Sequence, residues 1–477
     1  MIEYGKVFYA TGTVLFILAG ITAIPAAVDL CLAQSSGLSF IVSAIFCCFI
    51  AGLMFLPNRT HKAVFLTPKE KILAVLLSWI AVPIMSALPF ISSFGGNLSI
   101  SDCIFEVVSA LTTTGATCIR NTEKLSSGLL LWRSMLQLFG GIGFTVSCCC
   151  VFSDFIAPGS EKDGSGLKNA SLSHQLKTLV SLYLAAIVIG SFLLTGSGVP
   201  PTEALCCALD AISSGGILIS DINFSARSGM ILPILSLLMF MGGISFISAG
   251  NSGIKGFSVF GERQFVCYAV LTGIGILVLS VCMLLFSETS FSESLKTAAA
   301  AVISSLTTTG MAVRLPESFS SFADSCLYVS NFCGGCYGSC TGGIKIFRLM
   351  MMFYLVKSYL IRLVKTNAVF IPICEGKKIN EIDVTGLLSY FTCYLTFALV
   401  MSLGLTLVSD FDFGKAFGAV MTSVNNNGPF FGLHRATAAE ISELSEFAKA
   451  AFVVSMAAGR IEFISFLMIL IRPFWKK

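Results

Sequence analysis

Long apolar runs alternate with shorter amphipathic stretches along this chain. Ten runs reach the length needed to cross a bilayer, about 20 residues: 7–33, 37–56, 70–92, 128–153, 176–195, 229–249, 264–287, 322–360, 384–408 and 446–471. Four shorter stretches, at 101–113, 202–213, 292–308 and 412–424, fall between later runs, and each ends close to a glycine. Irregular backbone at membrane depth is tolerated only where it faces protein or a water-filled cavity. The pattern therefore predicts four units, each with a helix, a re-entrant half-helix, a glycine loop and a second helix.

These units define the predicted fold class and its division. The fold is expected to be an all-α polytopic membrane protein, with four pseudo-symmetric helix–pore-helix–helix repeats around a central pore and two N-terminal transmembrane helices. The first run lacks a cleavage site and is too long for a signal sequence, so we expect it to stay as an anchor. The predicted parts are the N-terminal addition at 1–57 and repeats at 58–160, 161–255, 256–370 and 371–477.

Composition and charge place the chain in a membrane and predict its orientation. Hydrophobic residues make up 55% of the chain and charged residues 12%, with a mean hydropathy of +0.87, which excludes a soluble domain. The positive-inside rule puts the more basic side, and both termini with it, in the cytoplasm. Acidic residues such as Asp102, Glu106, Glu203 and Asp210 are expected on the other side. They would form a cation-concentrating vestibule, or simply populate external loops.

A short phrase recurs at the ends of the four half-helices. Leu111-Thr112-Thr113-Thr114-Gly115 and Leu306-Thr307-Thr308-Thr309-Gly310 are close copies, and Ile212-Ser213-Ser214-Gly215-Gly216 and Val424-Asn425-Asn426-Asn427-Gly428 are looser ones. Glycine permits the backbone turn that aims successive carbonyls one way, and such oxygens can replace the hydration shell of a potassium ion. The predicted ion-binding residues are Thr113, Thr114, Gly115, Ser213, Ser214, Gly215, Thr308, Thr309, Gly310, Asn426, Asn427 and Gly428. Close helix packing is an alternative role for glycines, and it suits Gly140-Gly141-Ile142-Gly143 and Gly242-Gly243.

The run at 322–360 is too long for one crossing and is interrupted in its middle. The interrupting glycines are Gly334, Gly335, Gly338, Gly342 and Gly343. Because glycine disfavours a helix interior, we expect two half-helices joined by an intramembrane loop below the glycine loops. Such a loop can block or clear a pore, whereas close packing alone is the simpler interpretation.

Two basic residues accompany this predicted gate. Arg460 lies in the apolar last helix, where a charge is costly and functional by default, unless it forms a buried salt bridge. Lys345 follows the last glycines of the broken run. We interpret it as an anchor whose stem reaches toward the membrane surface, with a second pore charge as the alternative.

Other chemistries find little support in the sequence. Cys333, Cys336 and Cys340 have a spacing typical of metal ligands. With three histidines and eighteen cysteines scattered mostly through apolar runs, we interpret the cysteines as small hydrophobic residues. Neither a His-Glu-x-x-His motif nor a pair of aspartates on facing helices is present, so the chain is not expected to be an enzyme.

Together these motifs resemble the Trk/Ktr/HKT superfamily of potassium and sodium transporters over essentially the whole chain. Besides the four glycine loops, the resemblance includes Leu138-Phe139-Gly140-Gly141-Ile142-Gly143-Phe144, Phe240-Met241-Gly242-Gly243-Ile244-Ser245, Gly334 through Lys345, and Gly459-Arg460. The two extra N-terminal helices make the chain most similar to the TrkH branch. The resemblance implies potassium uptake, with the glycine-loop residues forming a filter that binds potassium. It also implies that the loop around 334–343 is the gate and that Arg460 is an electrostatic barrier beneath the filter.

The resemblance also implies partners and sets limits. It implies a homodimer in the cytoplasmic (inner) membrane of a prokaryote, in contact with membrane lipid but not with nucleic acid. Control would come from a cytoplasmic TrkA-type subunit that binds NAD or ATP/ADP, because this chain has no nucleotide fingerprint of its own. Sodium preference in the plant branch goes with serine at the first filter glycine, and this chain has Gly115. Ser213-Ser214-Gly215-Gly216 and Asn425-Asn426-Asn427-Gly428 depart from the family pattern, so sodium permeation or coupling to H⁺ or Na⁺ stays an alternative.

Overall fold

The computed structural model describes most of the chain. The residues outside the description are 1, 60–65, 95–97, 121, 123–124, 148–166, 217–228, 246–261, 287–289, 312–320, 366–372, 375–376, 379–380, 429, 432–433, 462–466, 470 and 476–477. Lys162 and Lys255, two of the basic residues on the side expected to face the cytoplasm, lie among them.

Seven described helices are long and apolar enough to cross a membrane. They are α1 (Tyr4–Cys31), α2 (Gly37–Phe55), α3 (Pro68–Phe94), α5 (Ser127–Ser147), α7 (Leu167–Gly196), α12 (Arg263–Phe286) and α16 (Glu381–Val408). Each corresponds to one predicted apolar run. The remaining three predicted crossings are shorter or interrupted within the described residues. They are α10 (Ile231–Gly242), α19 (Glu446–Arg460) and the pair α14 (Ser321–Ser330) and α15 (Ile346–Val364).

Four half-helices lie where the amphipathic stretches predicted them. They are α4 (Ile100–Leu111), α8 (Pro201–Ser213), α13 (Phe291–Leu306) and α17 (Phe413–Val424). Ser99 and Ser290 cap two of them, because their side chains accept the backbone N–H of Asp102 and Glu293. At 12 to 16 residues these helices are too short to span a bilayer. The predicted re-entrant elements are therefore confirmed as helices.

The all-α prediction holds apart from two very short ladders. Strand β1 (Ile373–Cys374) pairs antiparallel with β2 (Lys377–Lys378), with Ile373 opposite Lys378. Strand β3 (Phe430–Phe431) pairs antiparallel with β4 (His434–Arg435), with Phe430 opposite Arg435. Two short helices, α18 (Ala438–Ser442) and α21 (Arg472–Trp475), complete the described elements.

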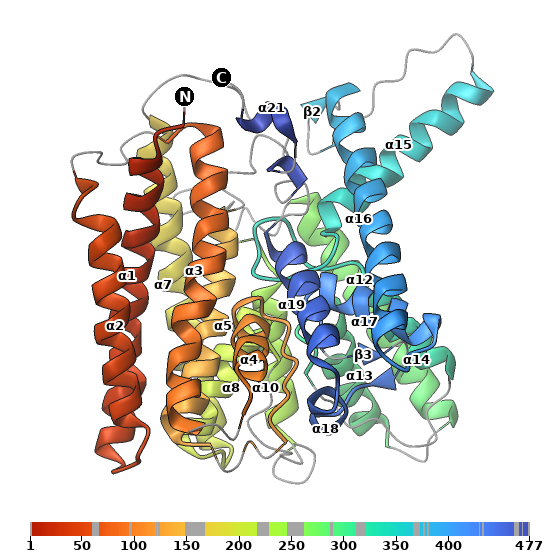
Figure 1. Ribbon diagram of the computed structural model, residues 1–477. Helices are drawn as coiled ribbons and strands as arrows, with labels where there is room; N and C mark the ends of the chain where they lie inside the picture. Colours follow the sequence, from red (N-terminus) through yellow and green to blue (C-terminus); the bar gives the residue numbers. More distant parts are fainter. Residues whose placement is uncertain are drawn as a thin grey trace.

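The helices form a bundle in which every half-helix packs between two other helices (Figure 1). The half-helix α4 contacts α3 and α5, α8 contacts α7 and α10, α13 contacts α12 and α14, and α17 contacts α16 and α19. The N-terminal pair α1 and α2 packs at one side against α3 and α5. Both termini lie at one end of the bundle, and the half-helices occupy the other half. The boundaries of the repeats stay predictions, but the packing order within each repeat is the same.

A glycine on an inner helix touches the end of a half-helix in three repeats. A Cβ atom built on this glycine would overlap the carbonyl oxygen of the last or next-to-last helical residue, so no side chain fits there. The pairs are Gly140 with Leu111 at 1.7 Å, Gly242 with Ile212 at 2.4 Å and Gly459 with Val424 at 1.9 Å. These glycines bring the inner helices against the backbone that leads into the glycine loops, as the packing interpretation of Gly140 and Gly242 predicts.

The third repeat lacks this packing because its second helix is broken. Residues 331–345, here called the broken-helix loop, separate α14 from α15 and carry no helix. Gly334, Gly338 and Gly343 have φ between 69° and 81°, which a residue with a side chain rarely adopts. The predicted interruption of the 322–360 run is therefore confirmed.

Candidate functional site: four glycine loops and the broken-helix loop

All four half-helices end in one backbone motif. In the first, the N–H of Thr113 donates to Ala110 O at 2.9 Å and the N–H of Thr114 donates to Ser109 O at 2.9 Å, which is a Schellman closure. The matching second bonds elsewhere are Gly215 N to Asp210 O at 2.9 Å, Thr309 N to Ser304 O at 2.8 Å and Asn427 N to Thr422 O at 3.0 Å. In each case a residue with left-handed backbone follows the helix, and a glycine with positive φ comes two residues later.

The shared geometry fixes which residues are equivalent. The left-handed residues are Thr113, Ser214, Thr308 and Asn426, with φ between 54° and 58°, and the positive-φ glycines are Gly115, Gly216, Gly310 and Gly428. The sequence pattern predicts Gly215 as the equivalent of Gly115, whereas the backbone angles make Gly216 the equivalent, one residue further along. Ser213-Ser214-Gly215-Gly216 contains two adjacent glycines, so the sequence alone does not show which one is equivalent to Gly115. The backbone angles identify Gly216.

The glycine loops meet in a closed ring. A Cβ on Gly115 would lie 2.3 Å from Gly215 O, and one on Gly216 would lie 1.7 Å from Thr309 O. A Cβ on Gly310 would lie 2.7 Å from the backbone of Gly428. The N–H of Gly428 donates to Thr114 O at 2.7 Å and so returns to the first loop. Each loop therefore touches the next, and four segments from across the chain surround one axis.

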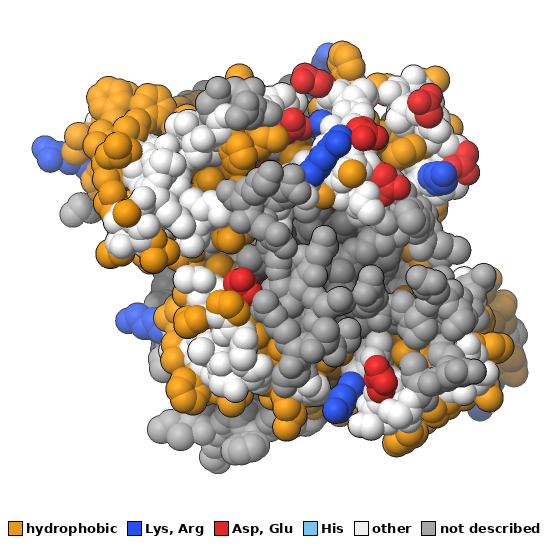
Figure 2. All heavy atoms as spheres, turned by 90° about the horizontal axis from the view of Figure 1, so that it is seen from below, with side chains coloured by type: hydrophobic (Ala, Val, Ile, Leu, Met, Phe, Trp, Pro, Cys, Tyr) orange, Lys and Arg blue, Asp and Glu red, His pale blue; other side chains and the backbone are white. Residues whose placement is uncertain are grey.

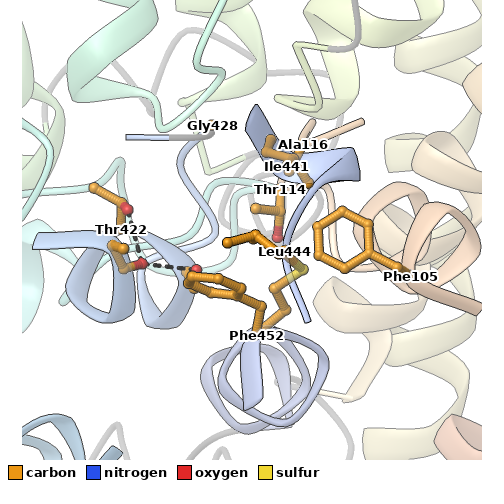
Figure 3. A pocket seen from close by; sticks show the side chains of 11 residues that line it. Phe105, Thr114, Ala116, Thr422, Gly428, Ile441, Leu444 and Phe452 are labelled. Carbon is orange, nitrogen blue, oxygen red and sulfur yellow. Dashed lines mark hydrogen bonds between the residues drawn. The ribbon is translucent and has the colours of Figure 1, made fainter. Parts of the chain in front are cut away.

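Apolar side chains support this ring from behind. A small cavity between the first and fourth repeats is lined by Phe105, Ile441, Leu444 and Phe452, and it borders Thr114 (Figure 3). The second repeat has its own buried cluster, which includes Leu209 and Ile212 of α8. Apolar surroundings of this kind hold backbone groups in place and raise the strength of electrostatic interactions among them.

The broken-helix loop contacts two of the glycine loops directly. The N–H of Gly342 donates to Thr308 Oγ1 at 2.7 Å, and the N–H of Gly343 donates to Asn425 O at 3.0 Å. A Cβ on Gly342 would lie 2.0 Å from the same Asn425 oxygen. The loop thus lies against the ring, on the side of the third and fourth repeats.

The remaining repeats hold the loop through other bonds. The N–H of Cys336 donates to Gly243 O at 2.9 Å, where α10 ends. Cys340 Sγ lies 3.4 Å from the Tyr183 hydroxyl and 3.7 Å from Thr145 Oγ1. All four repeats therefore contact the broken-helix loop, which places it across the common axis.

Two buried cations accompany this loop, and both lie over one aromatic ring. Arg460 is 1% exposed, donates from Nη2 to Cys340 O at 2.9 Å and lies 4.3 Å from the Phe144 ring centre. Lys345 is 2% exposed and lies 5.2 Å from the same ring. Its Nζ donates to oxygens of Ser339 and Thr341 within the loop, including Thr341 Oγ1 at 3.0 Å. The interpretation of Lys345 as a surface anchor is wrong, because its ammonium group lies inside the loop.

Sequence reasoning missed a buried ion pair behind the first glycine loop. Arg133 on α5 lies 2.7 Å from Glu106 on α4, and both side chains are 1% exposed. Glu106 also accepts hydrogen bonds from Thr117 Oγ1 and the N–H of Cys118, which follow the first glycine loop. The assignment of Glu106 and the buried Asp210 to an outer vestibule is wrong. Arg133 in the apolar run at 128–153 was the available signal.

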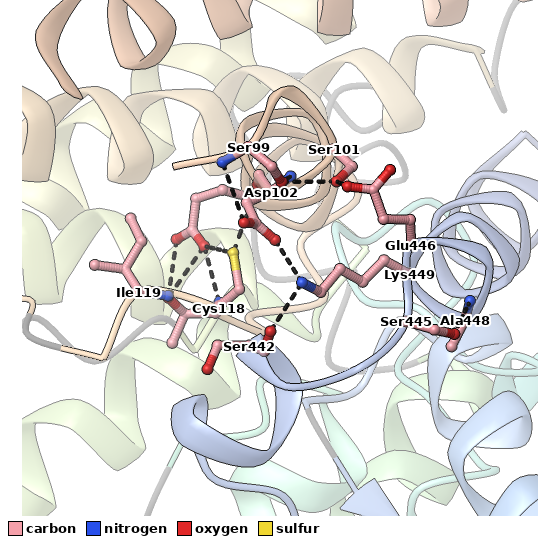
Figure 4. Close-up of polar contacts among 12 residues, drawn as sticks. Ser99, Ser101, Asp102, Cys118, Ile119, Ser442, Ser445, Glu446, Ala448 and Lys449 are labelled. Carbon is pink, nitrogen blue, oxygen red and sulfur yellow. Dashed lines mark hydrogen bonds and ion pairs between the residues drawn. The ribbon is translucent and has the colours of Figure 1, made fainter. Parts of the chain in front are cut away.

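The face that carries the half-helix N-termini is not purely acidic (Figure 2). Asp102 pairs with Lys449 at 2.7 Å (Figure 4). Glu443 pairs with Arg120 at 3.0 Å. Burial acts to raise the pKa of Asp102, but hydrogen bonds from Lys449 and Ser99 outweigh it and lower the pKa below its ordinary value. These pairs join the first and fourth repeats, and they neutralise part of the expected acidic vestibule.

The unusual asparagine of the fourth glycine loop has a partner in the broken-helix loop. Asn427 Nδ2 donates to Asn331 Oδ1 and to Ser305 O, the latter at 3.2 Å. Ser305 Oγ in turn donates to Asn331 Oδ1 and lies 2.6 Å from Ser330 Oγ. The departure from the family pattern thus adds a polar link between the fourth glycine loop, α13 and the end of α14.

The cysteines of the broken-helix loop do not gather. Cys336 and Cys340 are buried and Cys333 is partly buried. Among the described residues no group of three or more histidine, cysteine, aspartate or glutamate side chains could hold a metal ion.

Within the described residues, seven apolar spans, four re-entrant half-helices and a closed ring of glycine loops define a multi-span membrane protein with a fourfold internal repeat. Comparison with known proteins gives the family. A model of the TrkH family, described as cation transport protein, matches residues 38–249 and 254–474, and the chain belongs to this family. Members of this class are transporters, so the expectation that the chain is not an enzyme is met.

Relatives of known name cover the whole chain. It is 28% identical over 487 residues to the Trk system potassium uptake protein TrkH of Salmonella typhimurium, covering 98% of each chain. It is 28% identical to TrkH of Escherichia coli K12, again over 98% of each. The structure is similar to the crystal structure of the potassium transporter TrkH from Vibrio parahaemolyticus, with a TM-score of 0.89, 26% identity and full coverage of both chains.

Proposed function

We propose that this protein takes up potassium across the cytoplasmic membrane through a pore lined by the four glycine loops. The observation that carries the proposal is the closed ring, in which each of the four positive-φ glycines lies against the backbone of a neighbouring loop. The half-helices add to it, because each directs its partially negative C-terminal end toward the ring. The named relatives are potassium uptake proteins, which supports potassium as the ion.

A sodium-permeable pore, or a potassium symporter coupled to H⁺ or Na⁺, is the second candidate. The observation that favours it is the departure of the second and fourth glycine loops from the family pattern. Competition between ions distinguishes the two candidates.

The test is rubidium-86 uptake into proteoliposomes that contain the chain alone, with potassium or sodium as competitor. We expect potassium to block uptake and sodium to have little effect. For Gly115→Ser we expect the preference for potassium to fall about tenfold, which corresponds to about 1.4 kcal/mol. A Cβ at this residue would lie 2.3 Å from Gly215 O, and φ is +79°.

Gly143→Ser is the matched control, since a Cβ on Gly143 meets no atom within 4 Å. It should retain the parent preference. Equal competition by sodium in the parent would contradict the potassium assignment, and a pH or sodium gradient that drives uptake would favour the symporter.

We further propose that the broken-helix loop is the gate, with Lys345 and Arg460 as its charges. Support comes from the contacts of the loop with all four repeats and from the burial of both cations beside Phe144. A blocked path needs no large rearrangement to open, because a loop without helical bonds moves at a lower cost than a helix.

Removal of the Lys345 ammonium should weaken closure of the loop. Hydrogen bonds to a charged group contribute about 1.5–3 kcal/mol, so Lys345→Met should raise basal rubidium uptake roughly tenfold or more. Lys357→Met is the control, because Lys357 is exposed on α15. Unchanged uptake in folded Lys345→Met protein would contradict a role of this side chain in closure.

The proposed assembly is a homodimer in the inner membrane with cytoplasmic termini, controlled by a TrkA-type nucleotide-binding subunit. One support is α15, which extends beyond the bundle at the end where the termini lie (Figure 1). Its exposed face combines Phe353, Val356 and Leu360 with Lys357 and Lys365. A mixed apolar and basic face outside the bundle is suited to a protein partner at a cytoplasmic surface.

A further inference from the structure

The residue at the left-handed turn of each glycine loop is an unexpected choice. A Schellman closure favours glycine there, because other residues pay a steric cost at positive φ, and a β-branched residue pays most. Thr113 and Thr308 both have φ of 56°, and Ser214 has 58°. Backbone strain of this kind persists where a side chain is needed for function. The three hydroxyl groups are therefore the features to explain.

Two of these hydroxyls have no partner among the residues that the structure describes. Thr113 Oγ1 and Ser214 Oγ are buried and form no hydrogen bond with any of them. A buried hydroxyl without a partner is costly and uncommon. The fourth side chain at this level, Asn426, instead donates to Met456 O at 2.9 Å. Thr113 and Ser214 thus present oxygens that a cation, or a water bound to it, can use.

The third hydroxyl differs, because it is used by the broken-helix loop. Thr308 Oγ1 accepts the N–H of Gly342 at 2.7 Å. An amide hydrogen directed at this oxygen places positive partial charge where a cation ligated by the same oxygen would sit. The buried ammonium of Lys345, three residues further along, adds positive charge to the same loop. Thr308 Oγ1 can therefore bind the Gly342 amide or the cation, and binding of either one weakens the binding of the other.

We infer that Thr308 Oγ1 is a shared ligand, which binds either a monovalent cation at the end of the ring that faces the broken-helix loop or the Gly342 N–H of the closed loop. The inference rests on the proposed function and adds a linkage to it. A cation at this level favours release of the loop, and closure of the loop weakens cation binding by the same factor. The second bond, from Gly343 N to Asn425 O, does not involve the side chain of residue 308.

Hydrogen exchange of the segment 334–345 tests this inference in the full chain reconstituted in lipid nanodiscs. In the parent we expect exchange at Gly342 to be about tenfold faster in potassium chloride than in choline chloride, the size of effect that one buried hydrogen bond gives. Thr308→Val keeps the shape but removes the oxygen, so exchange should be fast in both salts. Thr308→Ser should behave like the parent.

Thr113→Val is the matched control, because it removes an equivalent hydroxyl that has no contact with the loop. In choline chloride, hydrogen exchange at Gly342 in Thr113→Val should equal that in the parent. The inference is overturned if Thr308→Val matches the parent in choline, if Thr113→Val accelerates exchange as much, or if the parent shows no difference between the salts. Rubidium uptake is measured on the same samples. Absence of uptake both in the parent and in Lys345→Met would refute the proposed function, while the exchange of Thr308→Val against Thr113→Val would still decide whether Thr308 holds the loop.

Discussion

Gly140→Ala should abolish the folded protein or leave it severely destabilised, whereas Gly143→Ala should not. A Cβ on Gly140 would lie 1.7 Å from Leu111 O and 2.6 Å from Leu111 C, and both are backbone atoms. Overpacking costs about 1–3 kcal/mol where side chains can yield, and we expect more than about 3 kcal/mol here because the backbone leads directly into the first glycine loop.

The control differs from the test only in position on the same helix. A Cβ on Gly143 meets no atom within 4 Å. Alanine is favoured over glycine in a helix by about 0.5–1 kcal/mol, so Gly143→Ala should be neutral or slightly stabilising. The measurements are the monodisperse fraction on size exclusion and the midpoint of thermal unfolding in detergent. Equal midpoints for the two variants would show that α5 and α4 do not pack as described.

Arg133→Met should destabilise the protein by about 3–5 kcal/mol, the usual cost of leaving one member of a buried ion pair without its partner. Arg133 lies 2.7 Å from Glu106, with both side chains 1% exposed, and the carboxylate would keep only its bonds from Thr117 and Cys118. Rubidium uptake should fall as well, since these bonds position the segment that follows the first glycine loop.

The double variant separates charge from packing. Glu106→Gln with Arg133→Met removes both charges and should recover most of the lost stability, because replacement of a buried pair by uncharged groups is often close to neutral. The midpoints of thermal unfolding of the parent, both single variants and the double variant give the coupling energy. Additive effects of the two single variants would contradict the direct pairing of Glu106 with Arg133.

The helices and half-helices followed from the sequence because hydropathy and helix length are local properties. The four amphipathic stretches gave α4, α8, α13 and α17 within two residues at each end. The glycines of the 322–360 run predicted the break between α14 and α15. The equivalent of Gly115 in the second repeat was predicted wrongly, because the sequence has two adjacent glycines there, Gly215 and Gly216, and does not distinguish between them.

Side-chain environments were less accessible to sequence reasoning. Lys345 and Glu106 looked like residues of a membrane surface, because their neighbours in the sequence include loop residues. The structure buries both side chains. Lys345 donates to Ser339 and Thr341 in the broken-helix loop, and Glu106 pairs with Arg133 of α5. A charge in a low-dielectric interior requires such partners, and no local pattern shows where they are.

Hydropathy and the recurring glycines were thus sufficient for the membrane class, the repeats, the half-helices and the broken helix, because each depends on residues close together in the chain. Packing alone decided that the glycine loops close into a ring, that Gly216 is the equivalent of Gly115, and that Gly342 bonds to Thr308. These contacts join segments far apart in the sequence, Thr114 with Gly428 and Glu106 with Arg133 among them. Such pairings arise only when separate helices and loops pack together and each buried polar group finds its partner in space.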